Sequence, residues 1–330
     1  MGPKMLHLSS ITTISIFFYM FVLHVVDGTY GPEAEGPTTA ESSDLDELQL
    51  SPAPSPRIVY VDDYRARADD AGDHTERASA GNLQALYFRR CTHLVVEGLR
   101  IRDSMQMHVA IAYSWKVHVS RLLIAAPAWS PNTDGIHVSN SREVLISDCI
   151  ISTGDDCISI VTGSMFVQAT GIFCGPGHGI SIGSLGANKS WAHVSDVLVE
   201  RATLVGTTNG VRIKTWQGGG GFAERITFQD ISMHNVTNPV IIDQNYCDSK
   251  SPCHEQGSAV AINNIRYRNI RGTSSSRLAI SFVCSNSVHC DGIVMQDVSL
   301  VGEGTYVSCY YMNARVLELG YNFPYCRAEM

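Results

Sequence analysis

The sequence predicts an all-β protein that folds as a right-handed parallel β-helix, a solenoid of short parallel strands. Three observations lead to this prediction. A bipartite unit of alternating apolar residues recurs along the chain, each half of the unit has the period of a strand, and no amphipathic helix of convincing length separates the copies. A β-sandwich also contains many short strands, but it does not explain why the same unit returns once per period.

The repeated unit reads apolar-x-apolar-x-x-apolar-x-apolar, with some copies imperfect at one position. The break of two residues at its centre predicts a bend between two short strands. We expect successive coils to stack about 4.8 Å apart, with inward Val, Ile and Leu side chains forming one long core. The copies are LVVEGLRI (from residue 94), VHVSRLLI (117), VLISDCII (144), VQATGIFC (167), VLVERATL (197), ITFQDISM (226), IRYRNIRG (265) and IVMQDVSL (293).

Composition agrees with a globular, strand-rich protein. The chain has 330 residues, of which 17% are charged, 44% are hydrophobic and 28 are glycine, as suits a fold with many turns. Its formal net charge of −8 argues against nucleic acid as a partner.

The N-terminal segment has the features of a secretion signal. Lys4 precedes the apolar stretch ITTISIFFYMFVLHVV, which ends in small residues near Gly28. At about sixteen residues this stretch is short for a membrane span. We therefore predict a signal peptide over residues 1–28, a secreted protein, and no membrane association once the signal is removed.

Two further segments precede the repeats. Residues 29–56 are acidic, rich in Pro and low in complexity. Residues 57–82 begin like a strand and continue as a charged run without a clear period, so we assign them to a degenerate N-terminal cap. The β-helix itself is predicted over residues 83–330.

The ten cysteines suit a secreted chain that forms disulfides. The close pairs Cys247/Cys253 and Cys284/Cys290 indicate small loop staples, whereas the rest of the connectivity stays open. Zinc is disfavoured because no CxxC pair has metal-ligand spacing. Asn188 and Asn235 open two N-glycosylation sequons.

Polar residues recur with the period of the coils. Asp134, Asp155 and His178 are 21 and 23 residues apart, and Arg212 and Lys214 follow one longer coil later. Because one coil takes about 20 to 30 residues, residues one period apart are expected to lie above one another. The spacing therefore predicts one polar column on the outer face.

Local geometry supports this column. Asp156 directly follows Asp155, and a bend permitted by Gly154 would turn both side chains toward the same groove. Arg212 and Lys214 alternate along a strand, so both charges share one face. A ladder of turn-forming Asp and Asn residues is the structural alternative.

The residue types in the column suit glycoside hydrolysis. Three crowded carboxylates resist full ionisation, so one of them should have a raised pKa and keep its proton. A protonated carboxyl beside ionised ones supplies an acid for the leaving oxygen and a base for water. The two cations would neutralise an anionic sugar.

Four segments of this column resemble a known family. SPNTDGIH (130–137), TGDDCISI (153–160), CGPGHGISIGSLG (174–186) and NGVRIKTWQGG (209–219) are similar to the four signature motifs of the polygalacturonases, glycoside hydrolase family 28, in their plant form. The likeness runs from about Leu86 to the C-terminus. It implies a β-helix in the cell wall that cuts the α-1,4-galacturonosyl linkages of pectin with inversion, without a metal or other cofactor.

The resemblance also implies roles for the acidic residues. Asp155 matches the general acid. Asp134 and Asp156 match the pair that holds and deprotonates the attacking water, and inversion requires carboxyls about 6.5–9.5 Å apart to admit it. His178 matches the residue that supports the acid.

Substrate contacts follow in the same way. Arg212 and Lys214 match the groups that bind the galacturonate carboxylate beside the scissile bond, and Asn132 and Tyr246 match positions of substrate contact. The expected partner is therefore pectic polysaccharide.

The sequence departs from the family pattern near its start. The segment VDDYRARADDAGDHTE resembles a degenerate copy of the family's N-terminal segment, with Arg65 in place of Gly, and several first coils are expected to be missing before Leu83. We therefore expect a monomer that can associate through an exposed N-terminal end. That end would leave four apolar side chains uncovered: Leu86, Phe88, Leu94 and Val96.

Two alternatives to an active polygalacturonase stay open at this point. Missing coils would suit a catalytically silent β-helix that binds pectin or has a structural role. Pectate lyase chemistry is the weaker alternative because it needs a calcium site, which the sequence does not indicate.

Overall fold

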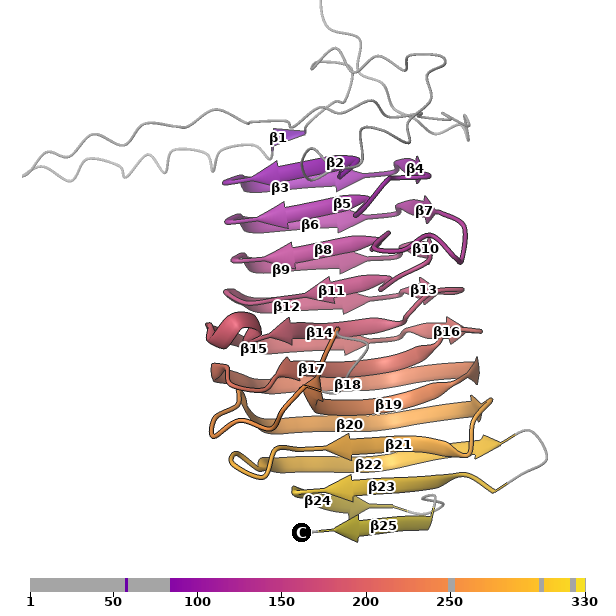
Figure 1. Cartoon of the computed structure of the whole chain (residues 1–330). Helices are drawn as coiled ribbons and strands as arrows, with labels where there is room; N and C mark the ends of the chain where they lie inside the picture. Colours follow the sequence, from indigo (N-terminus) through magenta and orange to yellow (C-terminus); the bar gives the residue numbers. More distant parts are fainter. Residues whose placement is uncertain (1–56, 59–83, 249–252, 303–305, 321–324, 330) are drawn as a thin grey trace, which may run out of the picture.

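The computed structural model describes residues 57–58, 84–248, 253–302, 306–320 and 325–329. The predicted signal peptide, the acidic segment over 29–56 and most of the predicted cap over 57–82 lie outside these residues. Within them, the predicted right-handed parallel β-helix is confirmed: coil stacks on coil along one axis (Figure 1). The described residues contain no helix long and apolar enough to cross a membrane.

One strand of each coil lies in a sheet of ten strands, in which every pair is parallel and the strand order follows the chain. This smaller sheet consists of β2 (Leu86–Arg89), β5 (Val109–Ala112), β8 (Ile136–Ser139), β11 (Ile158–Ile160), β14 (Ile180–Leu185), β17 (Asn209–Trp216), β19 (Asn238–Tyr246), β21 (Leu278–Val283), β23 (Ser308–Met312) and β25 (Tyr325–Glu329).

The repeated units of the sequence form the second sheet, which has fifteen strands among the described residues. Ten of its strands follow one another from coil to coil: β1 (Arg57–Ile58), β3 (Thr92–Glu97), β6 (Trp115–Ser120), β9 (Arg142–Ser147), β12 (Ser164–Thr170), β15 (Trp191–Glu200), β18 (Gly220–Val236), β20 (Ala261–Ser274), β22 (Cys290–Gly302) and β24 (Ala314–Leu319). Its short strands are β4 (Arg100–Arg102), β7 (Leu123–Ala125), β10 (Ile150–Ser152), β13 (Phe173–Cys174) and β16 (Thr203–Val205).

The predicted bend lies at the centre of every repeated unit. Leu94 pairs with Val117, and the same register continues coil by coil down to Ile293. In each copy the fifth residue has a left-handed backbone, which turns the strand without breaking the stack. These residues, with their φ angles, are Gly98 (70°), Arg121 (53°), Asp148 (54°), Gly171 (66°), Arg201 (51°), Asp230 (54°), Asn269 (50°) and Asp297 (54°).

The core is a column of inward side chains, as expected. Ile136, Ile158 and Ile180 occupy one register position in successive coils and are all fully buried. Towards the C-terminal end the same stacking is made by aromatic rings, with centroids 5.1–5.6 Å apart along the series Phe228, Tyr267, Phe282 and Tyr311. Burial of this continuous apolar column is the main stabilising term of the fold.

The four apolar side chains predicted to lie uncovered at the N-terminal end are buried, so that expectation is wrong. Leu86, Phe88 and Leu94 are each 3% exposed, and Val96 is 4% exposed. All four point inward and are in register with core residues of the next coil. In addition, β1 pairs in parallel with β3 and occupies its outer edge.

The two predicted loop disulfides, Cys247–Cys253 and Cys284–Cys290, are confirmed. A third, Cys157–Cys174, links residues 17 apart in sequence. The sequence did not predict this pair, because its two cysteines come together only when the coils stack.

The left-handed bend generates a prediction about stability. Gly98 has φ of 70°, and a Cβ atom added there would meet no other atom within 4 Å. Gly98→Ala should therefore destabilise the protein through its backbone alone, by about 1–2 kcal/mol, since that conformation brings Cβ close to the following carbonyl.

The measurement is the urea concentration at half-unfolding, with Gly257→Ala as control. Gly257 is equally open to solvent but does not have a left-handed φ, so its substitution should be nearly neutral. Equal midpoints for the two variants would contradict a backbone cost at the bend.

Candidate active site

The predicted polar residues come together along the smaller sheet. Asp134 lies just before β8, Asp156 just before β11 and His178 just before β14, each two residues ahead of a core isoleucine. Because those isoleucines pair in register, the three polar residues occupy the same position in successive coils. Arg212 and Lys214 follow on β17 of the next coil.

Asp155 and Asp156 lie in the bend between β10 and β11 and both reach the site, as expected. The reason differs from the predicted one, because Gly154 does not have a left-handed φ. Glycine is required because a Cβ atom at this position would overlap the carbonyl oxygen of Ser130. The Cys157–Cys174 disulfide fastens the end of the same bend to β13.

Asp156 is the most enclosed of the three carboxylates, with 2% of its side chain exposed. Arg212 Nη2 donates to its Oδ1 at 2.9 Å, and Lys214 Nζ donates to its Oδ2 at 3.0 Å. Ser181 Oγ donates to Oδ1 at 2.7 Å and accepts from Arg212 Nε at 3.1 Å. The two cations expected to meet a substrate carboxylate are thus held on Asp156, and their side chains are only 14% and 10% exposed.

Asp155 forms a pair with His178, whose Nδ1 lies 3.0 Å from Asp155 Oδ1. Burial alone would raise the pKa of Asp155, but the hydrogen bond and positive charge of His178 outweigh it and lower that pKa. The same hydrogen bond raises the pKa of His178 above its ordinary value, against the opposing effect of burial. The pair therefore retains one proton to a higher pH than an isolated histidine would.

Asp134 is buried and has no cation as a direct partner among the described residues. Burial, followed by the charges of Asp156 and Asp155, raises its pKa to about 7. Ser159 Oγ donates to Asp134 Oδ2 at 2.5 Å and lies 2.8 Å from His137 Nδ1. Burial lowers the pKa of His137 to about 4, so this imidazole is neutral at physiological pH.

Three polar residues of the site were missed by the sequence analysis: His137, Ser159 and Ser181. They form a second row beside the carboxylates, in register with one another and with Arg212. Ser159 and Ser181 each lie between two buried isoleucines of a strand, so alternation points their hydroxyls to the site face. That alternation, read from the motifs ISI and GIH, is the signal that could have identified them.

The two predicted substrate-contact residues flank the column. Asn132 donates its backbone N–H to Asp155 Oδ2 at 3.2 Å. Tyr246 ends β19, where its ring lies 5.3 Å from Lys214 Nζ and meets Trp216 edge-on at 5.5 Å. Tyr246 therefore helps to set the position of one of the two cations.

The site does not have the chemistry of a metal centre. Asp155, Asp156 and His178 each offer an atom within 4.8 Å of the others. However, both oxygens of Asp156 already accept bonds from Arg212 and Lys214, and His178 is hydrogen-bonded to Asp155. Two cations at the same carboxylate would repel a metal ion.

Comparison with known sequences places the chain in a family. Residues 68–317 match the model of glycosyl hydrolases family 28. The chain is 57% identical over 223 residues to polygalacturonase QRT2 of Arabidopsis thaliana, and 56% identical over 228 residues to a polygalacturonase of Persea americana. Each match covers 68% of this chain but 51% and 49% of the relatives, so the chain spans about half their length.

Solved structures show the same fold at lower identity. The endo-xylogalacturonan hydrolase from Aspergillus tubingensis has a TM-score of 0.65 at 23% identity, over 73% of this chain and 68% of that one. The polygalacturonase from Erwinia carotovora has a TM-score of 0.60 at 21% identity, over 71% of this chain and 60% of that one. Together with the match over residues 68–317, these likenesses lead to one conclusion: the chain belongs to glycosyl hydrolases family 28.

Proposed function

We propose that this chain hydrolyses α-1,4-galacturonosyl linkages of polygalacturonate, the acidic backbone of pectin, with inversion. The observation that carries the proposal is the unequal environment of three adjacent carboxylates. Asp155 shares a proton with a histidine, Asp156 is bound by two cations, and Asp134 is buried with a raised pKa. Acid and base roles on one glycosidic bond require such a difference.

Asp155 is assigned the role of general acid. Its side chain is 20% exposed, against 12% for Asp134 and 2% for Asp156, so it is the carboxyl most accessible to a substrate oxygen. His178 supplies the proton of the pair. This proton resides mainly on His178, because the pKa of His178 is raised and that of Asp155 is lowered. A galacturonate carboxylate bound closer to Asp155 than to His178 would favour its transfer to Asp155, because a like charge disfavours the ionised carboxylate.

Asp134 and Asp156 are assigned to the attacking water. They occupy equivalent positions one coil apart, and each accepts a serine hydroxyl from the following coil, Ser159 and Ser181 respectively. These hydroxyls orient the two carboxyls so that their remaining lone pairs can hold a water on the face opposite Asp155. Loss of a water proton to this pair, as Asp155 protonates the leaving oxygen, completes the inversion.

We also propose that the protein is secreted and acts in the cell wall as a monomer. The signal-like residues 1–28 support secretion, although they lie outside the described structure. The two sequon residues Asn188 and Asn235 are exposed, as N-glycosylation of a secreted protein requires. No feature of the described site favours the catalytically silent alternative.

Asp155→Asn tests the proposed function. An amide cannot give a proton to the leaving oxygen, so hydrolysis of polygalacturonate should fall about 10²–10⁴-fold, measured by release of reducing ends. Asp148→Asn is the control, because Asp148 is an exposed aspartate at the bend of the same coil and asparagine tolerates its left-handed φ of 54°. Activity at the parental rate in Asp155→Asn would overturn the assignment.

Arg212→Gln tests recognition of the substrate carboxylate. Losing a charge-assisted bond should lower kcat/KM on de-esterified polygalacturonate by about 10- to 100-fold, and less on methyl-esterified pectin, in which the carboxylates are masked. Because Arg212 also binds Asp156, kcat should fall together with the rise in KM.

Arg315→Gln is the matched control for this measurement, since Arg315 of β24 forms an exposed ion pair with Asp291 of β22. A parent protein that cleaves both substrates equally would remove the argument for carboxylate recognition.

The rate should depend on pH in a defined direction. The hydrogen bond to Asp155 raises the pKa of His178 and keeps the acid proton of this pair in the site at mildly acidic pH. That proton is lost as pH rises through the raised pKa, so kcat/KM should decline on the alkaline side of the ordinary histidine pKa of about 6.5. A profile that is flat from pH 5 to pH 8.5 would contradict the assignment of the acid proton to the Asp155–His178 pair.

A further inference from the structure

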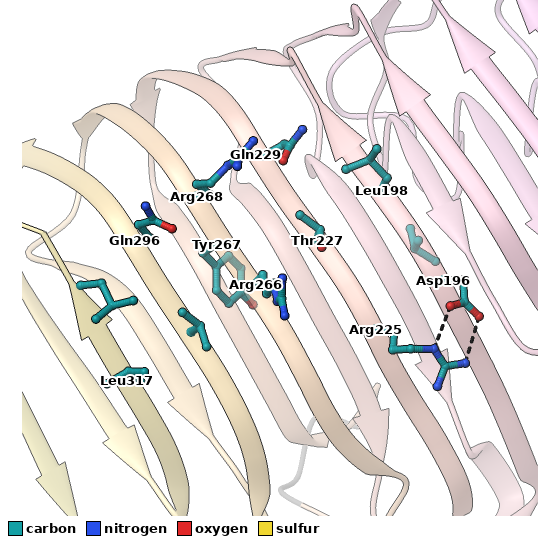
Figure 2. A pocket seen from close by; sticks show the side chains of 13 residues that line it. Asp196, Leu198, Arg225, Thr227, Gln229, Arg266, Tyr267, Arg268, Gln296 and Leu317 are labelled. Carbon is teal, nitrogen blue, oxygen red and sulfur yellow. Dashed lines mark hydrogen bonds and ion pairs between the residues drawn. The ribbon is translucent and has the colours of Figure 1, made fainter.

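A concavity lies on the outer face of the fifteen-stranded sheet, away from the carboxylates of the smaller sheet. It is an open groove of about 640 Å³ that crosses β15, β18, β20, β22 and β24. Figure 2 shows Arg266 and Arg268 of β20 in the groove, with Thr227 and Gln229 of β18 on one side and Gln296 of β22 on the other. Tyr267 lies between the two arginines in sequence and points into the core.

The two arginines are the uncompensated charges of this groove. Both are exposed, and the structure gives neither of them a hydrogen bond or an ion pair to another described residue. They are two residues apart on one strand, so both side chains project from the same face. Cations held side by side without counter-ions repel each other and favour an anionic ligand.

The acidic groups nearby are already bound to other partners. Asp196 accepts two bonds from Arg225, at 2.7 and 2.9 Å, and Arg225 also contacts Glu224. Glu200 accepts from Gln168 at 3.0 Å and from Gln229 at 2.8 Å. Among the charged residues that line the groove, Arg225 is paired with Asp196, so Arg266 and Arg268 leave the lining with a net positive charge in a chain whose formal charge is −8.

The remaining lining suits a sugar chain. Gln296 and Thr227 offer side-chain donors and acceptors for hydroxyl groups. Leu317 and Leu319 are 55% and 43% exposed and supply an apolar surface for the C–H face of a pyranose ring. A galacturonan segment presents the matching groups: a carboxylate on every sugar, hydroxyl groups, and the C–H face of each ring.

We propose that this groove is a second binding site for polygalacturonate, which holds a segment of the polymer outside the catalytic site. The inference rests on the proposed function, because it takes its ligand from there. A polymer bound at both faces would remain attached between cleavages. The segment held in the groove would keep the rest of the polymer at a high effective concentration near the catalytic site. A short oligomer would gain nothing from the second site.

The double variant Arg266→Gln/Arg268→Gln tests this proposal, with Arg271→Gln as the matched control. Arg271 lies on the same strand and is exposed, but it does not line the groove. Binding of polygalacturonate at low salt is measured by calorimetry on proteins that also carry Asp155→Asn, so that the polymer is not cut.

We expect about 3- to 10-fold weaker binding for the double variant, since each exposed ion pair is worth about 0.2–1 kcal/mol, and no change for Arg271→Gln. In proteins with Asp155 intact, KM for the polymer should rise while hydrolysis of a galacturonate trimer stays the same. Two results would overturn the proposal. The first is equal affinity of the double variant and of its control for polygalacturonate. The second is a parent protein that binds dextran sulfate as tightly as polygalacturonate, which would indicate binding by charge alone.

These measurements separate the second site from the proposed function. If the parent cuts polygalacturonate and the double variant is unaffected, the groove proposal fails and the enzyme assignment stands. If the parent does not cut the polymer but the double variant binds it more weakly, the enzyme assignment fails and the groove stands.

Discussion

Main-chain hydrogen bonding between successive coils is the constraint on which the rest of this structure depends. Each inner strand of the smaller sheet pairs with its equivalent one coil before and one coil after. In such a ladder a slip of one residue would exchange core and surface side chains. The buried series Ile136, Ile158 and Ile180 therefore specifies the register. The polar positions two residues earlier follow from it.

Stacking brings together charges that would separate in water, and each is compensated in its own way. Asp156 is bound by two cations and a serine, Asp155 by a histidine, and Asp134 by retention of a proton. A full set of ion pairs would make the three carboxylates alike. Because they are unequal, the same three groups can supply an acid and a base at one pH.

The same stacking geometry produces different surfaces on the two sheets. On the smaller sheet, side chains one coil apart converge on a compact cluster held by short hydrogen bonds and by the Cys157–Cys174 disulfide beside it. On the larger sheet, Arg266 and Arg268 lie exposed in an open groove and have no ion-pair partner among the residues described. A rigid cluster suits bond cleavage, whereas an open row of cations suits reversible contact with a polyanion.

The sequence by itself determined the architecture, the bend in each repeat and the column of Asp134, Asp155, Asp156 and His178. These features depend on periodicity, which is a local property of the chain. It also predicted the two short disulfide loops, where the partners lie 6 residues apart.

Only the tertiary structure decided which groups bind one another. The pairing of Arg212 and Lys214 with Asp156 spans 56 and 58 residues, and the serine row and the third disulfide likewise join different coils. It also decided that Leu86 and Phe88 are covered. Such contacts depend on how far each turn rotates one coil relative to the next, and turn lengths vary from coil to coil. Periodicity alone therefore places residues on a face but does not assign their partners.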